Sequence, residues 1–133
     1  MYMVTVSTSF DATHSLRMRD GQFEPVHRHQ WIVRGCFAGP DLDRQGLLVD
    51  FVLARARLEE ITSPLAGSHL NEWSALRGAN PSAERVAETV FHLLAAMPDL
   101  APTVHSVTVT EAPGCEASYM GKDTSPAQRN QPG

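Results

Sequence analysis

Four stretches of β-type sequence, two at each end of the chain, constrain the fold more than any other feature. Residues 2–14 and 27–37 alternate loosely and are rich in Val, Thr, Ser, Phe and Trp, which predicts two strands. Residues 104–110 alternate cleanly, and residues 117–120 form a last short stretch. Helical periodicity fills the middle of the chain. This order predicts an α+β domain with two helices on one face of a four-stranded sheet.

Each predicted helix has a recognisable start. The first follows Asp50, a good N-cap residue, and its predicted apolar face contains Val52, Leu53, Ala56, Leu58 and Ile61. The second starts near Ser82, has Glu84 in its first turn and ends at Pro98. Its predicted apolar face contains Val86, Val90, Leu93 and Leu94.

The chain has the organisation of one domain. Residues 1–122 contain no linker, and residues 123–133 have the Ser, Pro, Gln, Asn and Gly content of a disordered tail. The net charge is −4 and no basic run is present, so we expect no nucleic-acid partner. No apolar run approaches the roughly 20 residues that span a bilayer, and the N-terminus does not resemble a signal peptide. We therefore expect a cytoplasmic protein with no membrane partner.

A four-stranded sheet of this kind has two open edges. An uncovered edge presents unpaired backbone groups and pairs readily with another chain. The sequence therefore predicts a homo-oligomer.

Three of the six histidines fall where the first two strands end and begin. His27 and His29 are two residues apart, so they project from the same face of a strand. If the two strands pair as a hairpin, His14 at the end of the first strand reaches the same point. Three imidazoles and one open position are the ligand set of a catalytic zinc site. The alternative is a surface His-x-His pair beside a lone buried histidine, and the spacing alone leaves both interpretations open.

Seven short motifs occur in order between Phe10 and Gly121. They are Phe10–Leu16, His27–His29, Gly46–Phe51, Leu70–Asn71, Asn80–Glu84, Glu111 and Tyr119. No single motif is specific, but the ordered set resembles the family of 6-pyruvoyltetrahydropterin synthase and its bacterial relative, 6-carboxytetrahydropterin synthase.

The resemblance implies a fold, an assembly and a site. The fold is the T-fold, a four-stranded antiparallel sheet in the order ββααββ with two helices packed on one face. Trimers stack into a hexamer, and the sites lie at subunit interfaces. The resemblance also implies zinc on His14, His27 and His29. It implies that Glu111 binds a pterin or guanine-like ring through an acceptor-only carboxylate.

The chain departs from the family pattern where the catalytic cysteine is expected. Phe23 stands at that position, and phenylalanine cannot exchange a proton. Glu24 lies three residues before His27, where a subgroup of the family uses glutamate. Glu24 is either a general base whose pKa is raised by desolvation or a solvated loop carboxylate, and both interpretations stay open. Arg28 replaces the family's glycine. Its positive charge either weakens metal binding or holds an anionic group.

A second departure removes the family's Asp-His pair, which completes its proton relay. Ala66 and Gly67 occupy those positions, and His69 lies two residues too late. Glu24 and His69 are therefore doubtful catalytic residues. The favoured hypothesis is a pterin-binding homologue without the standard synthase activity, and action on another pterin-like substrate is left open. The alternatives are an active metal-dependent lyase on dihydroneopterin triphosphate that uses Glu24 as base, and a non-enzymatic oligomeric scaffold or sensor.

Overall fold

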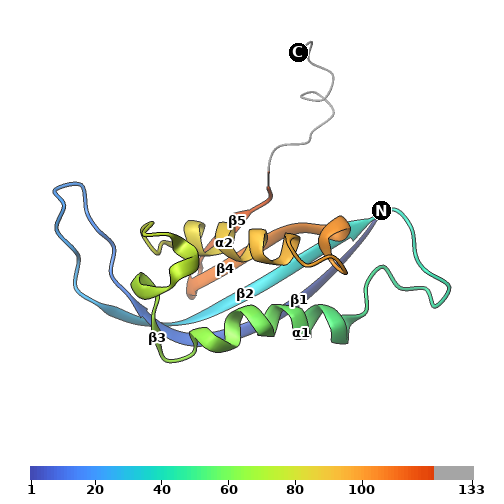
Figure 1. Cartoon of the computed structure of the whole chain (residues 1–133), viewed down its shortest axis with the longest axis horizontal. Helices are drawn as coiled ribbons and strands as arrows, with labels where there is room; N and C mark the ends of the chain where they lie inside the picture. The colour runs from blue at the N-terminus through green and yellow to red at the C-terminus, as the bar shows by residue number, and fades with distance from the viewer. Residues whose placement is uncertain (122–133) are drawn as a thin grey trace, which may run out of the picture.

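The computed structural model describes residues 1–121, in which two helices cover one face of a single sheet (Figure 1). The strands are β1 (Tyr2–His14), β2 (His27–Gly39), β3 (Ser68–His69), β4 (Val104–Ala112) and β5 (Cys115–Tyr119). The helices are α1 (Phe51–Thr62) and α2 (Ala83–Ala95). Short 3-10 helices span Ser63–Leu65, Leu70–Glu72, Ser74–Leu76 and Ala101–Thr103. The tail predicted for residues 123–133 lies outside the described residues.

The strand order in the sheet is β3-β1-β2-β4-β5. β1 and β2 pair antiparallel along their whole length, from Tyr2 opposite Gly39 to His14 opposite His27. β4 pairs antiparallel with both β2 and β5. The predicted α+β class and the four predicted strands are confirmed. The strictly antiparallel, four-stranded sheet is wrong, because the two-residue strand β3 pairs parallel to β1. A strand of two residues is too short to produce an alternating sequence pattern.

The core lies between the sheet and the two helices. Alternate residues of the central strands face it, including Phe10, Trp31 and Val33, which are at most 4% exposed. On α2 the buried residues are Val86, Ala87, Val90 and Leu94, so the predicted face is nearly correct, although Leu93 is 36% exposed. Both predicted N-caps are confirmed: the Asp50 carboxylate accepts from the Val52 N–H, and the Ser82 hydroxyl accepts from the Arg85 N–H.

The predicted apolar face of α1 is partly wrong. Its buried residues are Ala54, Leu58, Ile61 and Thr62, whereas Val52 and Ala56 are exposed. Each residue turns a helix by about 100°, so side chains two positions before Ala54 and Leu58 point to the opposite side. Ala54, Leu58 and Ile61 form the face of α1 that packs against the sheet.

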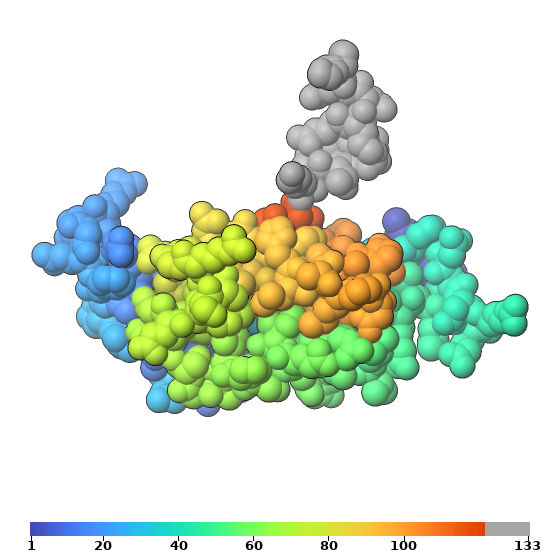
Figure 2. Space-filling model, in the orientation of Figure 1, coloured from blue at the N-terminus to red at the C-terminus, as the bar shows by residue number. Residues whose placement is uncertain are grey.

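Two long loops project from opposite ends of the molecule (Figure 2). Residues 15–26 connect β1 to β2, and residues 40–50 connect β2 to α1. The loop of residues 15–26 lies at the same end of the sheet as the histidines of β1 and β2, so it borders the candidate site. Within residues 1–121, no helix has the length and hydropathy to traverse a bilayer.

Candidate metal and ligand site

The three histidines at the ends of β1 and β2 converge on one point. His14 is the register partner of His27, and His29 projects from the same face of β2 as His27. The ring centroids of His14 and His29 are 5.2 Å apart, and each lies 5.8 Å from the centroid of His27. The pairing register therefore brings together the three imidazoles that the sequence placed at this strand junction.

This spacing fits one tetrahedral ion. With zinc–nitrogen bonds of about 2.0–2.1 Å, the ring centres of imidazoles bound to one zinc lie about 5.2 Å apart. The His14–His29 separation of 5.2 Å equals that value, and the two separations of 5.8 Å that involve His27 exceed it by about 0.6 Å. The ligand atoms of His14 and His29 lie within 4.8 Å of each other, and His27 is beside them, so donors of this kind fit a metal ion.

His14 is oriented by a backbone carbonyl. Its side chain is 2% exposed, and its Nδ1 atom lies 2.8 Å from the carbonyl oxygen of Pro81. A carbonyl only accepts hydrogen bonds, so Nδ1 carries the proton and donates it. The lone pair of a neutral His14 is therefore on Nε2, the nitrogen that faces the site. Metal-binding histidines are commonly fixed in this way.

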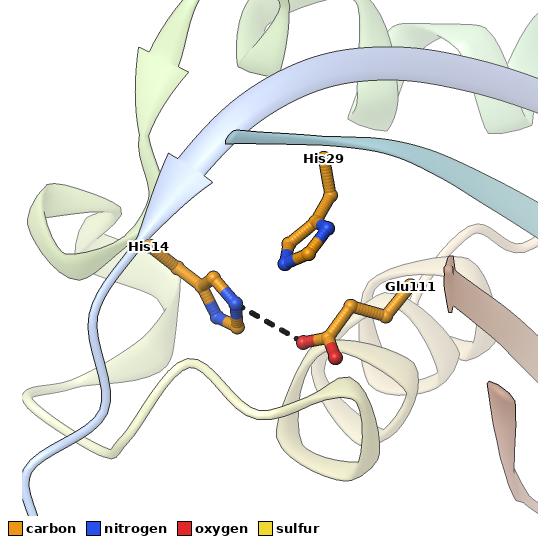
Figure 3. Close-up of side chains that lie close together, drawn as sticks. All are labelled: His14, His29 and Glu111. Atoms are coloured by element: carbon orange, nitrogen blue, oxygen red, sulfur yellow. Dashed lines mark ion pairs between the residues drawn. The ribbon is translucent and has the colours of Figure 1, made fainter. Parts of the chain in front are cut away.

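Glu111 reaches the histidine cluster from β4. Its Oε1 atom lies 3.1 Å from Nε2 of His14, the contact drawn in Figure 3. Ligand atoms of His14, His29 and Glu111 all lie within 4.8 Å of one another. Sequence reasoning gave Glu111 a ring-binding role and missed its contact with His14. β2 lies between β1 and β4, so no local spacing signals this contact.

Trp31 lies beneath the cluster. The indole is 0% exposed and meets the rings of His14 and His29 edge-on, with centroids 4.8 and 6.0 Å away. Its Nε1–H donates to the carbonyl oxygen of Ala12 at 3.2 Å. The indole thus links the core to the two histidine rings and restricts their positions.

Glu24 contacts the cluster through His27. Its Oε1 atom lies 3.2 Å from Nε2 of His27 and accepts a hydrogen bond from the Leu16 N–H. These contacts keep the pKa of Glu24 below its ordinary value: the backbone N–H of Leu16 is the largest cause, and the His27 side chain adds to it. The sequence left open whether desolvation raises this pKa, as a general base would need, or whether Glu24 is a solvated loop carboxylate. Desolvation acts in that direction, but the hydrogen bond from Leu16 outweighs it, so the pKa of Glu24 is lowered.

Two asparagines hold the segment that follows His14. The Asn71 amide accepts from the Ser15 N–H at 2.9 Å and donates to the Ser15 carbonyl at 2.7 Å. The Asn80 amide makes the same pair of bonds with Arg17, at 2.7 and 2.9 Å. Each side-chain amide thus makes the pair of backbone hydrogen bonds that a residue of a neighbouring strand would make. Both asparagines belong to motifs quoted above, and the sequence did not reveal this role.

Replacing Asn71 with alanine is expected to destabilise the protein by about 1–3 kcal/mol, because it leaves the N–H of the buried Ser15 without an acceptor. Urea denaturation followed by circular dichroism measures this change. Asn80→Ala is the matched control: it removes the same pair of bonds at an exposed site, where water replaces them. Equal, near-zero effects of both substitutions would contradict the proposed role of Asn71.

His69 does not join the cluster. Its Nδ1 atom lies 2.9 Å from the Thr13 hydroxyl, and Thr13 points to the sheet face opposite His14. Ala66 and Gly67 precede it at the edge of β1, where the Gly67 N–H donates to the carbonyl oxygen of Asp11. Arg28 is exposed and alternates with His27 and His29, so it projects from the opposite face.

One hollow is lined by neighbours of the cluster, and a second is lined by Glu111 itself. A cavity of about 370 Å³ is lined by Arg17, Phe23, Asn71 and Pro81 among others, and the Arg17 guanidinium lies 5.5 Å from the centre of the Phe23 ring. A smaller cavity of about 210 Å³ is lined by Ala83, Glu84, Glu111, Cys115, Glu116 and Ala117. The Glu111 carboxylate therefore lies between the histidines and a hollow that can accept part of a ligand.

Comparisons with known proteins identify the family. The family model described as 6-pyruvoyl tetrahydropterin synthase matches residues 3–122. The 6-carboxy-5,6,7,8-tetrahydropterin synthase of Synechocystis sp. is 29% identical over 135 residues, which cover 95% of this chain and 98% of the relative.

Solved structures share the fold. The 6-pyruvoyl tetrahydropterin synthase of Caenorhabditis elegans has a TM-score of 0.74 at 19% identity, covering 92% of this chain and 98% of that one. A catalytic-residue mutant of the Plasmodium vivax 6-pyruvoyltetrahydropterin synthase has a TM-score of 0.68 at 17% identity, covering 89% and 96%. The T-fold implied by the motifs is thereby confirmed. Because the family model matches nearly the whole described chain, the protein belongs to the 6-pyruvoyl tetrahydropterin synthase family.

Proposed function

We propose that this protein is a metal-dependent pterin-binding member of the family that lacks the standard synthase reaction. The observation that carries the proposal is the contrast between two sets of residues. His14, His29 and Glu111 meet within 4.8 Å, with His27 alongside. The positions of the family's proton relay hold Phe23, Ala66 and Gly67, which cannot exchange protons.

In this proposal His14, His27 and His29 hold zinc, and one coordination position remains for a carboxylate or water. Zinc bound there would act as a Lewis acid that polarises an oxygen on the ligand's side chain. The residues themselves orient the site: Pro81 sets the tautomer of His14, and Trp31 packs against two of the imidazoles. Elemental analysis of protein purified without chelator is expected to find zinc. Protein that neither contains zinc nor binds added zinc stoichiometrically would contradict this assignment.

The ligand is proposed to be a pterin or a guanine-like ring bound by Glu111. Both rings present adjacent ring and amino N–H groups, which an ionised carboxylate accepts in pairs. A thermal-shift screen with pterins, purines and their triphosphates tests this class. A ligand at 100 times its dissociation constant stabilises the folded state by about 2.7 kcal/mol. The proposal fails if adenine-type purines or unrelated heterocycles stabilise the protein and neither pterins nor guanine-like compounds do.

Replacing Glu111 with alanine is expected to weaken the binding of neopterin at least tenfold. A hydrogen bond to a charged group contributes about 1.5–3 kcal/mol, and the substitution removes the acceptor of two such bonds. Titration calorimetry measures the affinity, and Glu116→Ala, in the same hollow, is the control. Unchanged affinity in Glu111→Ala would remove this residue from the ligand site.

The proposed assembly is a homo-oligomer, a hexamer by resemblance, with sites at subunit interfaces. Within residues 1–121, β3 covers only Ala12 and Thr13 of the outer edge of β1, so most of that edge is free to pair. Analytical ultracentrifugation tests the assembly, and a monomer at micromolar concentration would contradict it. A cytoplasmic location remains a prediction.

An active synthase is the second candidate function. It is favoured by the contact of Glu24 with His27 at 3.2 Å, and the Plasmodium vivax mutant structure identifies its replaced glutamate as a catalytic residue. The lowered pKa of Glu24 makes it a weaker base, which counts against this candidate. A non-enzymatic scaffold or sensor has no use for the three histidines and Glu111.

A further inference from the structure

The two glutamates at the site contact different histidines. Oε1 of Glu24 lies 3.2 Å from Nε2 of His27, and Oε1 of Glu111 lies 3.1 Å from Nε2 of His14. The Glu24 carboxylate also accepts from the Leu16 N–H. Glu111, in contrast, lies with His14 and His29 in one set of converging ligand atoms. Of the two carboxylates, Glu111 is therefore better placed to bind an ion held by the histidines.

The contact between His14 and Glu111 has an electrostatic consequence. His14 donates its Nδ1–H to Pro81, so Nε2 of the neutral ring is an acceptor, and a carboxylate oxygen is also an acceptor. Two acceptors 3.1 Å apart repel each other unless a proton or a metal ion lies beside both. Ligand atoms on one tetrahedral zinc are separated by about 3.3–3.4 Å. The observed distance is close to that separation.

We propose that Glu111 is the fourth metal ligand of the ligand-free protein, and that a pterin ring opens the site by taking this carboxylate. The inference rests on the proposed metal and pterin site, and it assigns one residue to both. An oxygen bound to a metal has less negative charge to offer to the ring N–H groups. Ring recognition and the opening of a coordination position are therefore coupled through Glu111.

The first test measures metal affinity without any ligand. Zinc affinity from competition with a chelator is expected to fall at least tenfold in Glu111→Gln, since even outer-sphere substitutions cost about 10–100-fold. The cobalt-substituted variant should also change its visible absorption. Glu84→Gln is the matched control, because Glu84 lines the same hollow and the substitution removes the same charge.

The second test uses unsubstituted pterin, which has the ring but no side chain to reach the metal. Pterin is expected to bind the zinc-loaded wild type more weakly than the metal-free protein. Bound pterin should lower the affinity for zinc by the same factor. Calorimetry on both forms measures this reciprocity.

The outcomes separate this inference from the proposed function. Equal zinc affinity in Glu111→Gln and wild type, or equal pterin affinity with and without zinc, overturns the inference and leaves the three-histidine site standing. If zinc affinity falls in Glu24→Gln and not in Glu111→Gln, the inference is overturned and Glu24 is the fourth ligand. Failure of the wild type to bind zinc or pterin overturns both proposals.

Discussion

The purified protein is expected to convert dihydroneopterin triphosphate to 6-pyruvoyltetrahydropterin at least 10²-fold more slowly than a family member with an intact relay. The reaction requires protons to be taken from and returned to carbons and hydroxyls of the substrate side chain. A positioned acid or base typically contributes about 10²–10⁴-fold to such a step. Here Phe23, Ala66 and Gly67 stand where the relay residues are expected.

The neighbouring residues do not rebuild this relay within one chain. Glu24 is close to His27, but its pKa is lowered, so it accepts protons weakly. His69 is bound to Thr13 on the opposite face of the sheet. Each would have to change its contacts before it replaced a missing residue.

Product formation can be followed by chromatography with fluorescence detection, with the Synechocystis relative assayed in parallel. Glu24→Gln and His69→Ala complete the experiment. Turnover within tenfold of a competent synthase, abolished by either substitution, would mean that the relay is formed by these neighbours and that the prediction is wrong. Residual turnover that neither substitution changes would agree with a site that lacks acid–base residues.

Restoring the family residues is not a simple reversal. Gly67 has a φ of 75°, a left-handed conformation in which a non-glycine residue costs about 1–3 kcal/mol. Histidine at this position would therefore strain the turn before β3.

The sequence revealed the features that depend on residues only a few positions apart along the chain. Alternation placed His27 and His29 on one face, and the hairpin register added His14 opposite His27. The caps Asp50 and Ser82 were visible because capping depends on residues only a few positions apart.

The features that the sequence concealed depend on contacts between distant segments. Glu111 meets His14 across an intervening strand, and Asn71 pairs with Ser15, 56 residues away. The direction of the Glu24 pKa depends on the backbone N–H of Leu16, which the folded loop brings to it. No periodicity or motif spacing encodes these three contacts.

Replacing Trp31 with alanine is expected to have the largest effect on stability, about 3–5 kcal/mol, because the substitution leaves a cavity in the core. The indole is fully buried, stacks near Phe10 with the two rings within 6° of parallel, and donates to Ala12. Its edge-on contacts with His14 and His29 mean that metal affinity should fall together with stability. Urea denaturation followed by circular dichroism measures the first effect, and zinc competition in the absence of urea measures the second.

The second tryptophan provides the control. Trp73 is half-buried and packs at the margin of the core, so Trp73→Ala should destabilise the protein less and leave zinc affinity unchanged. Trp31→Phe keeps an aromatic ring but loses the hydrogen bond to Ala12, and it should fall between the wild type and Trp31→Ala in both measurements. If Trp31→Ala lowered stability but bound zinc as tightly as the wild type, the indole would stabilise the core and have no role in metal binding. The positions of the histidine rings would then be set by Pro81 and the strand register.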